Sequence, residues 1–380
     1  MTTTVNNEHK NIKVPNLRFK EFEGEWKEER LADIADLYKG TGISKDQLSD
    51  DGEPCILYGE LYTKYKSETI REVISKTNIN NTKLVRSKAN DVIIPCSGET
   101  AEDIATARCV LNGNILLGGD LNIIRLHGYD GAFMSYQLNG RRKYDIAKVA
   151  QGVSVVHLYG EHLKGVKTIN PCLEEQKKIA KLLSLLDERI ATQNKIIDKL
   201  QSLIKGIAQK IVRSNKPNVR LYECVECSSS TQQESEVCEQ GAYPVYGANG
   251  IVGYLDDYNT EGEAVYIIKD GSGVGTVSYV TGKCSATGTL NTLQAKDGYS
   301  LQYLYYLLKV FNFEPYKTGM AIPHIYFKDY GKAKVFCPSY TEQLQYARLL
   351  SAIDSKLSVE KNTLRKLSLQ KQYLLRQMFI

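Results

Sequence analysis

One stretch of this chain occurs twice, and it limits the possible folds more than any other feature. The first copy begins at Pro171 and the second at Pro338, and a Glu-Gln pair follows each proline at the same distance. Beyond that pair, apolar residues recur with the four-three spacing of a coiled-coil seam. The pattern predicts two long amphipathic helices, over residues 171–215 and 338–380.

Matched apolar seams indicate that the two helices pack against each other. The first helix ends near Val212 and the second begins near Pro338, so an antiparallel pair needs the simpler connection. Both copies interrupt the seam with a polar residue at the same place, Gln193 and Glu360, which argues against two unrelated surface helices. The seam residues expected to hold the pair together are Ile179, Leu183, Leu186, Ile190, Leu350, Ile353 and Leu357.

The segments outside the helices repeat as well. GVSVVHLY at 152–159 corresponds to GMAIPHIY at 319–326, and VIIPCSG at 92–98 resembles VYIIKDGSG at 265–273. Short apolar runs between Pro54 and Leu126 alternate with turns and predict strands, and a helical stretch interrupted near Gly140 follows. The repeat unit is therefore a globular domain followed by a long helix.

The predicted fold class is α/β (α+β). We expect two globular domains, separated by two long antiparallel coiled-coil helices, with a pseudo-twofold internal repeat. The predicted boundaries are a flexible tail over 1–14, domain 1 over 15–170, helix 1 over 171–215, domain 2 over 216–337 and helix 2 over 338–380.

Composition narrows the class of protein. The net charge of +5 permits nucleic-acid binding without demanding it. The sequence lacks an apolar run of the roughly 18–20 residues of a membrane span, and its N-terminus lacks a signal peptide's apolar core, which predicts a cytoplasmic location. Nine irregularly spaced cysteines indicate reduced thiols. Free thiols are also favoured over structural zinc at Cys224 and Cys227, because no histidine lies nearby.

The sequence does not contain the usual motifs of a methyltransferase, a nucleotide-binding enzyme or a zinc protease. INPCL at 169–173 departs from the NPPY-type motif of amino-methyltransferases, and GSGVGT at 271–276 ends in threonine, so it is a weak dinucleotide-loop match. The sequence contains no HEXXH motif and no complete P-loop. We therefore expect no catalytic residue, no metal site and no cofactor on this chain.

The two domains differ where a target would be read. Loop one reads PCSGETAEDIATARC and loop two reads KDGSGVGTVSYVTGKC, so similar scaffolds carry different side chains. Duplex DNA offers two features at a fixed separation, since one turn is about 34–36 Å. Residues of the types that contact bases or phosphates are candidates for DNA binding: Lys39, Ser97, Glu99, Thr100, Arg141, Arg142, Tyr246, Asn249, Lys269, Ser272, Thr276 and Lys283. His157 and His324 are added because they occupy equivalent places, although a shared packing role is favoured for them.

Three features together carry a resemblance to a known family. They are the opening PNLRFKEFEGEW, the two P-x-x-x-EQ helix starts, and YPVYGANGIVGYLDDY at 243–258. With the repeated order of domain and helix, the chain resembles the specificity subunit of a Type I restriction–modification enzyme from about Pro15 onward.

The resemblance implies a function. Two target recognition domains would each read one half of a bipartite, asymmetric DNA site, and the helices would set the spacing between the halves. The helices would also dock two modification subunits, which methylate adenine with S-adenosylmethionine. Two restriction subunits, which use ATP and Mg²⁺, would complete the complex. Two alternatives stay open: a coiled-coil adaptor that binds proteins rather than DNA, and a stand-alone nuclease or methylase.

Overall fold

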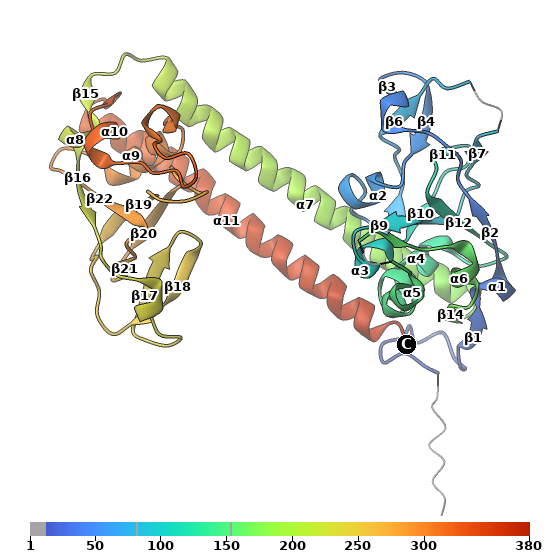
Figure 1. The fold of residues 1–380 in the computed structure, drawn as a ribbon. Helices are drawn as coiled ribbons and strands as arrows, with labels where there is room; N and C mark the ends of the chain where they lie inside the picture. The colour runs from blue at the N-terminus through green and yellow to red at the C-terminus, as the bar shows by residue number, and fades with distance from the viewer. Residues whose placement is uncertain (1–12, 81–82, 153) are drawn as a thin grey trace, which may run out of the picture. The chain divides into compact units, whose positions relative to one another are not determined.

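The computed structural model of the protein describes residues 13–80, 83–152 and 154–380 (Figure 1). The predicted flexible tail lies outside these ranges except for its last two residues, and so does Val153 of the repeated segment. The chain forms two compact units. Unit 1 combines the residues up to Gln193 with Leu364–Ile380, and unit 2 comprises Asn194–Thr363.

Unit 1 contains two five-stranded sheets. All five residues of the central strand β8 (Asp91–Pro95) are buried, so its aliphatic run contributes to the core on both faces. The first sheet has the order β2 (Ala35–Lys39), β12 (Leu121–Leu126), β8 (Asp91–Pro95), β10 (Arg108–Val110) and β5 (Thr69–Ile70). The second has the order β3 (Leu48–Ser49), β6 (Ser75–Thr77), β4 (Glu53–Ile56), β11 (Leu116–Leu117) and β7 (Val85–Arg86). These strands confirm the strand-rich region expected from the sequence.

Helices cover the first sheet of unit 1. Helix α4 (Gly131–Asn139) contacts β8 and β10, and α5 (Lys143–Val149) follows after the predicted break at Gly140. Phe133 of α4 packs against Trp26 and Phe379, with ring centroids 5.9 and 5.1 Å apart, so both ends of the described chain contribute to this core. The shorter helices of the unit are α1 (Leu31–Ile34), α2 (Glu60–Thr63), α3 (Ala101–Ile104), α6 (Gly160–Lys164) and the 3₁₀ turn η1 (Lys45–Gln47).

Unit 2 is built around a four-stranded sheet with a smaller three-stranded sheet. The first has the order β16 (Val225–Ser229), β22 (Leu290–Ala295), β19 (Glu263–Ile268) and β20 (Val277–Thr281). The second has the order β18 (Gly250–Leu255), β17 (Tyr243–Gly247) and β21 (Ser285–Ala286). Helix α9 (Leu301–Leu308) packs on β19 and β20. Shorter elements are α8 (Leu221–Cys224), α10 (Phe327–Tyr330), η2 (Glu234–Glu236) and η3 (Glu314–Tyr316).

Both units begin and end their globular part in the same way. In unit 1 the first strand β1 (Lys27–Arg30) pairs antiparallel with the last strand β14 (Lys167–Asn170). In unit 2 β15 (Val219–Arg220) pairs antiparallel with β23 (Lys334–Val335). A four-residue helix follows the first strand in each, α1 and α8. The internal repeat predicted from the sequence is therefore confirmed in the backbone.

The two predicted long helices are α7 (Leu173–Arg213) and α11 (Tyr340–Gln377). The glutamine of the P-x-x-x-EQ motif anchors each helix start to its own domain. Gln176 donates to the Pro171 carbonyl at 2.8 Å and accepts from the amide of Asp130, the N-cap of α4, at 3.0 Å. Gln343 donates likewise to Pro338 at 2.9 Å and accepts from the amide of Ser300, the N-cap of α9, at 2.9 Å. Each motif thus satisfies backbone groups that a helix start leaves open.

Within each unit the two long helices run antiparallel. In unit 2, Ile211 and Leu350 line one cavity, and Ile204 and Leu357 line another. Residue numbers therefore fall along α7 in the direction in which they rise along α11. In unit 1, Asp187 near the start of α7 faces Lys371 near the end of α11. Of the predicted seam residues, Ile179, Leu183, Leu186, Leu350 and Leu357 are buried, whereas Ile190 and Ile353 are half-buried.

Candidate nucleic-acid interface

In unit 1, a short antiparallel pairing brings two distant loops together. Strand β9 (Ser97–Gly98) follows the buried strand β8, and it pairs with β13 (Val156–His157) in the segment before α6. The amide of Leu158 donates to the Cys96 carbonyl at 2.9 Å, which fixes the register. His157 therefore lies opposite Ser97, and its Nδ1 is 3.3 Å from the Ser97 hydroxyl.

Unit 2 contains the same arrangement. The amide of Ile325 donates to the Lys269 carbonyl at 2.9 Å, and His324 lies opposite Asp270. The Nδ1 of His324 is 2.6 Å from a carboxylate oxygen of Asp270. The matching backbone pairings make Lys269 equivalent to Cys96, and Asp270 equivalent to Ser97.

A stacked tyrosine accompanies the histidine in both units. A tyrosine two residues later, on the same side of the strand, stacks on the ring: Tyr159 at 6.2 Å and 21°, and Tyr326 at 6.5 Å and 22°. Both tyrosines are exposed. His157 is exposed and the His324 side chain is 35% exposed, so neither ring is buried in the core.

A glycine makes each of these loops turn. Gly152 has φ of 124°, and Gly319 has φ of 86°. A Cβ atom would lie 2.1 Å from the Val155 carbonyl oxygen at the first glycine, and 2.3 Å from the Ile322 carbonyl oxygen at the second. Only glycine fits either position, so the repeated Gly-to-His spacing reflects one shared turn.

A pocket of about 600 Å³ lies beside this pairing in unit 1. Ser97 and Glu99, two of the predicted DNA contacts, line it together with Val155 of the turn. The hydroxyl of Tyr62 donates to the Ser97 carbonyl at 3.1 Å and so holds the pocket wall in place. The other lining residues are Tyr58, Gly59, Thr63, Gly98, Asp103 and Ser154.

Thr100 and Lys39, two further predicted contacts in unit 1, have interactions of their own. Thr100 is the N-cap of α3, and its hydroxyl oxygen accepts from the Asp103 amide at 3.0 Å. Lys39 is 64% exposed at the end of β2, with its ammonium 3.9 Å from Asp120. The Lys39 ammonium is thus exposed to solvent, whereas the Thr100 hydroxyl caps helix α3.

The predicted phosphate contacts Arg141 and Arg142 are engaged elsewhere. Arg141 donates to the carbonyl of Arg376 at 2.9 Å, and Arg142 donates to the main-chain oxygen of Ile380 at 3.2 Å. Cations at a helix C-terminus satisfy its open carbonyls and complement its dipole. The structure thus uses both guanidinium groups to hold the end of α11.

The predicted contacts of unit 2 fall into two regions. Lys269 is in the backbone pairing with the histidine segment, and Ser272 and Thr276 are exposed in the loop that follows. The second region is near β17 and β18. There Tyr246 is half-buried against Tyr266 and Asn249 is exposed between the strands, while Lys283 lies 4.6 Å from the centre of the Tyr258 ring. The hydrogen bond that its ammonium donates to Tyr258 raises the pKa of Lys283 above its ordinary value.

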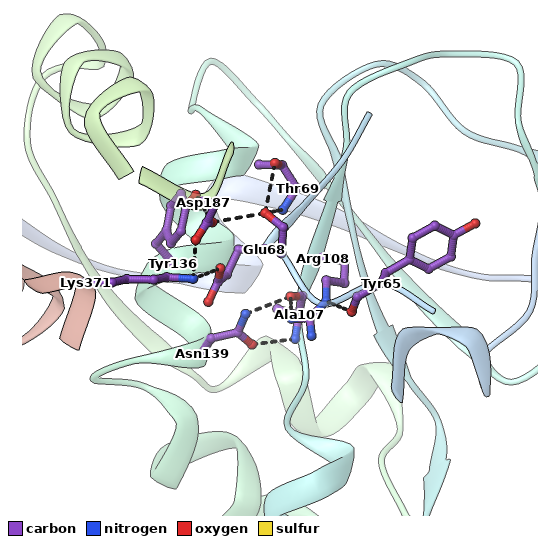
Figure 2. A network of polar contacts seen from close by, with 10 residues as sticks. Tyr65, Glu68, Thr69, Ala107, Arg108, Tyr136, Asn139, Asp187 and Lys371 are labelled. Atoms are coloured by element: carbon purple, nitrogen blue, oxygen red, sulfur yellow. Dashed lines mark hydrogen bonds and ion pairs between the residues drawn. The ribbon is translucent and has the colours of Figure 1, made fainter. Parts of the chain in front are cut away.

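A buried charge network joins the end of α11 to the rest of unit 1 (Figure 2). The Lys371 ammonium lies 2.6 Å from Glu68 and 2.6 Å from Asp187. Tyr136 and Ser67 donate to the second oxygen of Asp187, at 2.7 and 3.0 Å. Nearby, Arg108 donates to backbone carbonyls. Burial raises the pKa of Glu68 despite the ammonium, whereas the two carboxylates outweigh burial at Lys371 and raise its pKa.

The structure also locates the CxxC cysteines. The sulfur of Cys224 lies 3.8 Å from that of Cys337 at the end of the domain, and both residues are buried. Cys227 instead lies against the Ser228 carbonyl. Over the described residues, no group of three or more His, Cys, Asp or Glu side chains is placed to hold a metal ion. Among the residues that the structure describes, no helix has the length and apolar character needed to span a membrane.

The sequence did not identify two residues that contact the histidine loops only in the folded protein. Asp270 and Tyr62 were not candidates, because their partners are far away in the sequence. One signal was present: the repeated His-x-Tyr at 157–159 and 324–326 marks both loops.

Comparisons with known proteins point to one family. Residues 23–202 and 218–369 match the type I restriction modification DNA specificity domain. The type I restriction enzyme MjaVIII specificity subunit of Methanocaldococcus jannaschii is 27% identical over 248 residues, which cover 59% of this chain and 56% of the relative. The chain thus spans little more than half of that relative. A putative type I specificity subunit of Mycoplasma genitalium is 25% identical over 285 residues, covering 68% of this chain and 73% of the relative.

Solved structures share the fold. The S subunit of a type I restriction–modification system from M. genitalium superposes with a TM-score of 0.71 at 20% identity, covering 97% of this chain and 99% of that one. A chain from a study of assembly and conformational transition of the type I R-M system gives a TM-score of 0.51 at 15% identity, covering 93% and 97%. Since the matched domains make up most of its length, this chain belongs to the type I restriction modification DNA specificity family.

Proposed function

We propose that this chain is a non-catalytic, sequence-specific DNA-binding specificity subunit. It reads a bipartite, asymmetric site, and each globular domain reads one half. One observation carries this proposal: the two units present the same histidine–tyrosine loop on the same backbone pairing, but the residue opposite the histidine differs. A shared scaffold with different facing side chains suits two half-sites of different sequence.

The chain works as part of a complex. Two modification subunits methylate adenine with S-adenosylmethionine, and two restriction subunits use ATP and Mg²⁺. The long helices α7 and α11 position these partners and set the spacing between the half-sites. The M. jannaschii relative is named as a specificity subunit of a restriction enzyme, which supports this assignment. The chain has no cofactor of its own, and the complex acts in the cytoplasm.

The reading surface of unit 1 is the pocket beside Ser97 and His157. Its exposed Glu99 accepts hydrogen bonds only, so it suits the exocyclic amino group of cytosine or adenine and repels phosphate. In unit 2 the corresponding surface contains His324 with Lys269, Ser272 and Thr276. Lysines such as Lys39 and Lys283 contact phosphates, which position the protein without specifying sequence.

A methylation map tests the proposal. DNA from cells that express this chain with its modification subunit should carry methylated adenine within one split, asymmetric motif. A formed complex that adds no methylation would contradict the proposal.

Salt dependence separates the proposal from the protein-binding adaptor. A DNA-reading complex should lose affinity for duplex DNA steeply as salt rises, because phosphate contacts release counterions. An adaptor would show no salt-dependent binding to a duplex, whatever its sequence.

A further inference from the structure

The residue opposite the histidine decides which ring nitrogen carries the proton. A carboxylate only accepts hydrogen bonds, so in the 2.6 Å contact the Nδ1 of His324 must donate to Asp270. A serine hydroxyl both donates and accepts, so the 3.3 Å contact of Ser97 allows the Nδ1 of His157 to be either donor or acceptor. The same histidine is therefore held in one tautomer in unit 2 and in neither one in unit 1.

The His324 ring is fixed in orientation as well. Its backbone pairs on both sides, with Asp270 and with Thr318, and its ring stacks on Tyr326. The ammonium of Lys328 lies 5.3 Å from the centre of the Tyr326 ring, which places a positive charge beside the tyrosine that stacks on the histidine. At the equivalent place in unit 1 stands Glu161, paired with Lys164 at 2.6 Å. A fixed ring beside a cation is suited to a groove lined by phosphates.

We infer that Asp270 is a positioning residue, which fixes His324 so that its Nε2 reads a base edge. This inference rests on the proposed function. In the neutral ring, with Nδ1 donating to Asp270, Nε2 is a hydrogen-bond acceptor. In the major groove its partner is the amino group of adenine or cytosine, and it rejects the O4 of thymine and the O6 of guanine. One strand position in the half-site of unit 2 is therefore restricted to adenine or cytosine.

Exchanging the residue opposite each histidine tests the inference. We would express the complete chain with its modification subunit and map methylated adenine for Asp270→Ser, Asp270→Glu and His324→Ala. Asp270→Ser frees the tautomer, so the restricted position should accept guanine or thymine, with discrimination reduced about tenfold or more. Asp270→Glu retains a carboxylate, which only accepts hydrogen bonds, and should keep the original half-site. His324→Ala should relax the same position as Asp270→Ser.

Unit 1 supplies the matched control. Ser97→Asp should fix His157 in the tautomer of His324 and narrow one position of the other half-site, leaving the half-site of unit 2 unchanged. Thermal unfolding of each purified variant shows whether it is folded. A role of Asp270 in folding alone would lower the unfolding temperature without changing which bases are methylated.

The outcomes separate the inference from the proposed function. A wild-type chain that directs no split methylation motif overturns the proposed function. A wild-type motif that Asp270→Ser and His324→Ala both leave unchanged overturns the inference alone. Relaxed discrimination in Asp270→Glu as well as in Asp270→Ser also overturns it, because the acceptor-only carboxylate would then not be what matters.

Discussion

Lys371 shows at the scale of one residue how a buried charge can determine which parts of a chain pack together. Its side chain is 16% exposed and lies between two carboxylates whose side chains are 12% and 8% exposed. At the equivalent seam position of unit 2, α7 carries Ile204, which is buried. The apolar seam alone does not distinguish the two helix ends, whereas the ion network accepts only a cation at this place.

Replacing Lys371 by Met should destabilise unit 1 strongly. Glu68 and Asp187 would stay buried beside Arg108 without the Lys371 ammonium, and breaking a buried pair on one side costs about 3 kcal/mol or more. Urea unfolding of the full chain measures this loss. Replacing Glu68 by Gln and Asp187 by Asn in the same variant should restore most of the stability, and a single variant as stable as the wild type would contradict the prediction.

The pH dependence of the Lys371→Met variant follows from Glu68. Its pKa in the folded protein already lies above the ordinary 4.5, so protonation favours the folded state. This contribution is fully present below the ordinary pKa and is lost as pH rises through the folded pKa. Removing the ammonium should raise that pKa further. The deficit of the variant relative to the wild type should therefore be smaller at pH 5 than at pH 8, measured by the same unfolding experiment.

At the scale of the element, the long helices bury one stripe and expose another. Leu183 and Leu350 are fully buried in the seam, while their neighbours Leu185 and Leu349 are 49% and 51% exposed. Figure 1 shows α7 and α11 as continuous helices, and each contributes to both units. The exposed leucines are therefore matched controls on the same helices.

Replacing Leu183 by Asp should destabilise the protein, and replacing Leu185 by Asp should not. The buried substitution removes the packing of the leucine and places an unpaired carboxylate in the seam. Together these effects cost about 4 kcal/mol or more. The exposed substitution should stay within about 0.5 kcal/mol. Leu350→Asp and Leu349→Asp form the same pair on α11. Thermal unfolding and co-purification with the modification subunit report the result, and equal effects at buried and exposed positions would show that the seam does not hold the helices.

At the scale of the whole molecule, the repeat makes the two globular domains exchangeable parts. Residues 216–337 lie between the end of α7 and the start of α11, so they can be exchanged without changing a residue of either helix. The side chains of the anchoring glutamines Gln176 and Gln343 bind the proline carbonyl before them and the N-cap of one helix in their own domain.

Exchanging residues 216–337 with those of another family member should change one half of the methylated motif. The other half and the spacing should stay the same, because unit 1 and the helices are unaltered. Methylation mapping measures both halves at once, and the reciprocal exchange of residues 15–170 is the control. Changes in both halves after a single exchange would contradict independent reading by the two domains.

The sequence by itself determined the architecture, because its signals are local or periodic. The seam spacing gave the long helices, and the repeated Gly-to-His segment marked equivalent loops in both domains. Turn-bounded apolar runs gave the strands around β8. Each of these signals lies within one short stretch of sequence, so it can be recognised without knowing which stretches are in contact.

Only the tertiary structure decided how side chains are used. Arg141 and Arg142 resemble a phosphate-binding run in the sequence, yet they bond the carbonyls at the end of α11. Cys224 faces Cys337 rather than Cys227, and Asp270 faces His324 across the fold. Such pairs are set by strand register and helix packing between segments far apart in the chain. Because a one-residue shift in register would exchange the partners, no local pattern in the sequence can specify them.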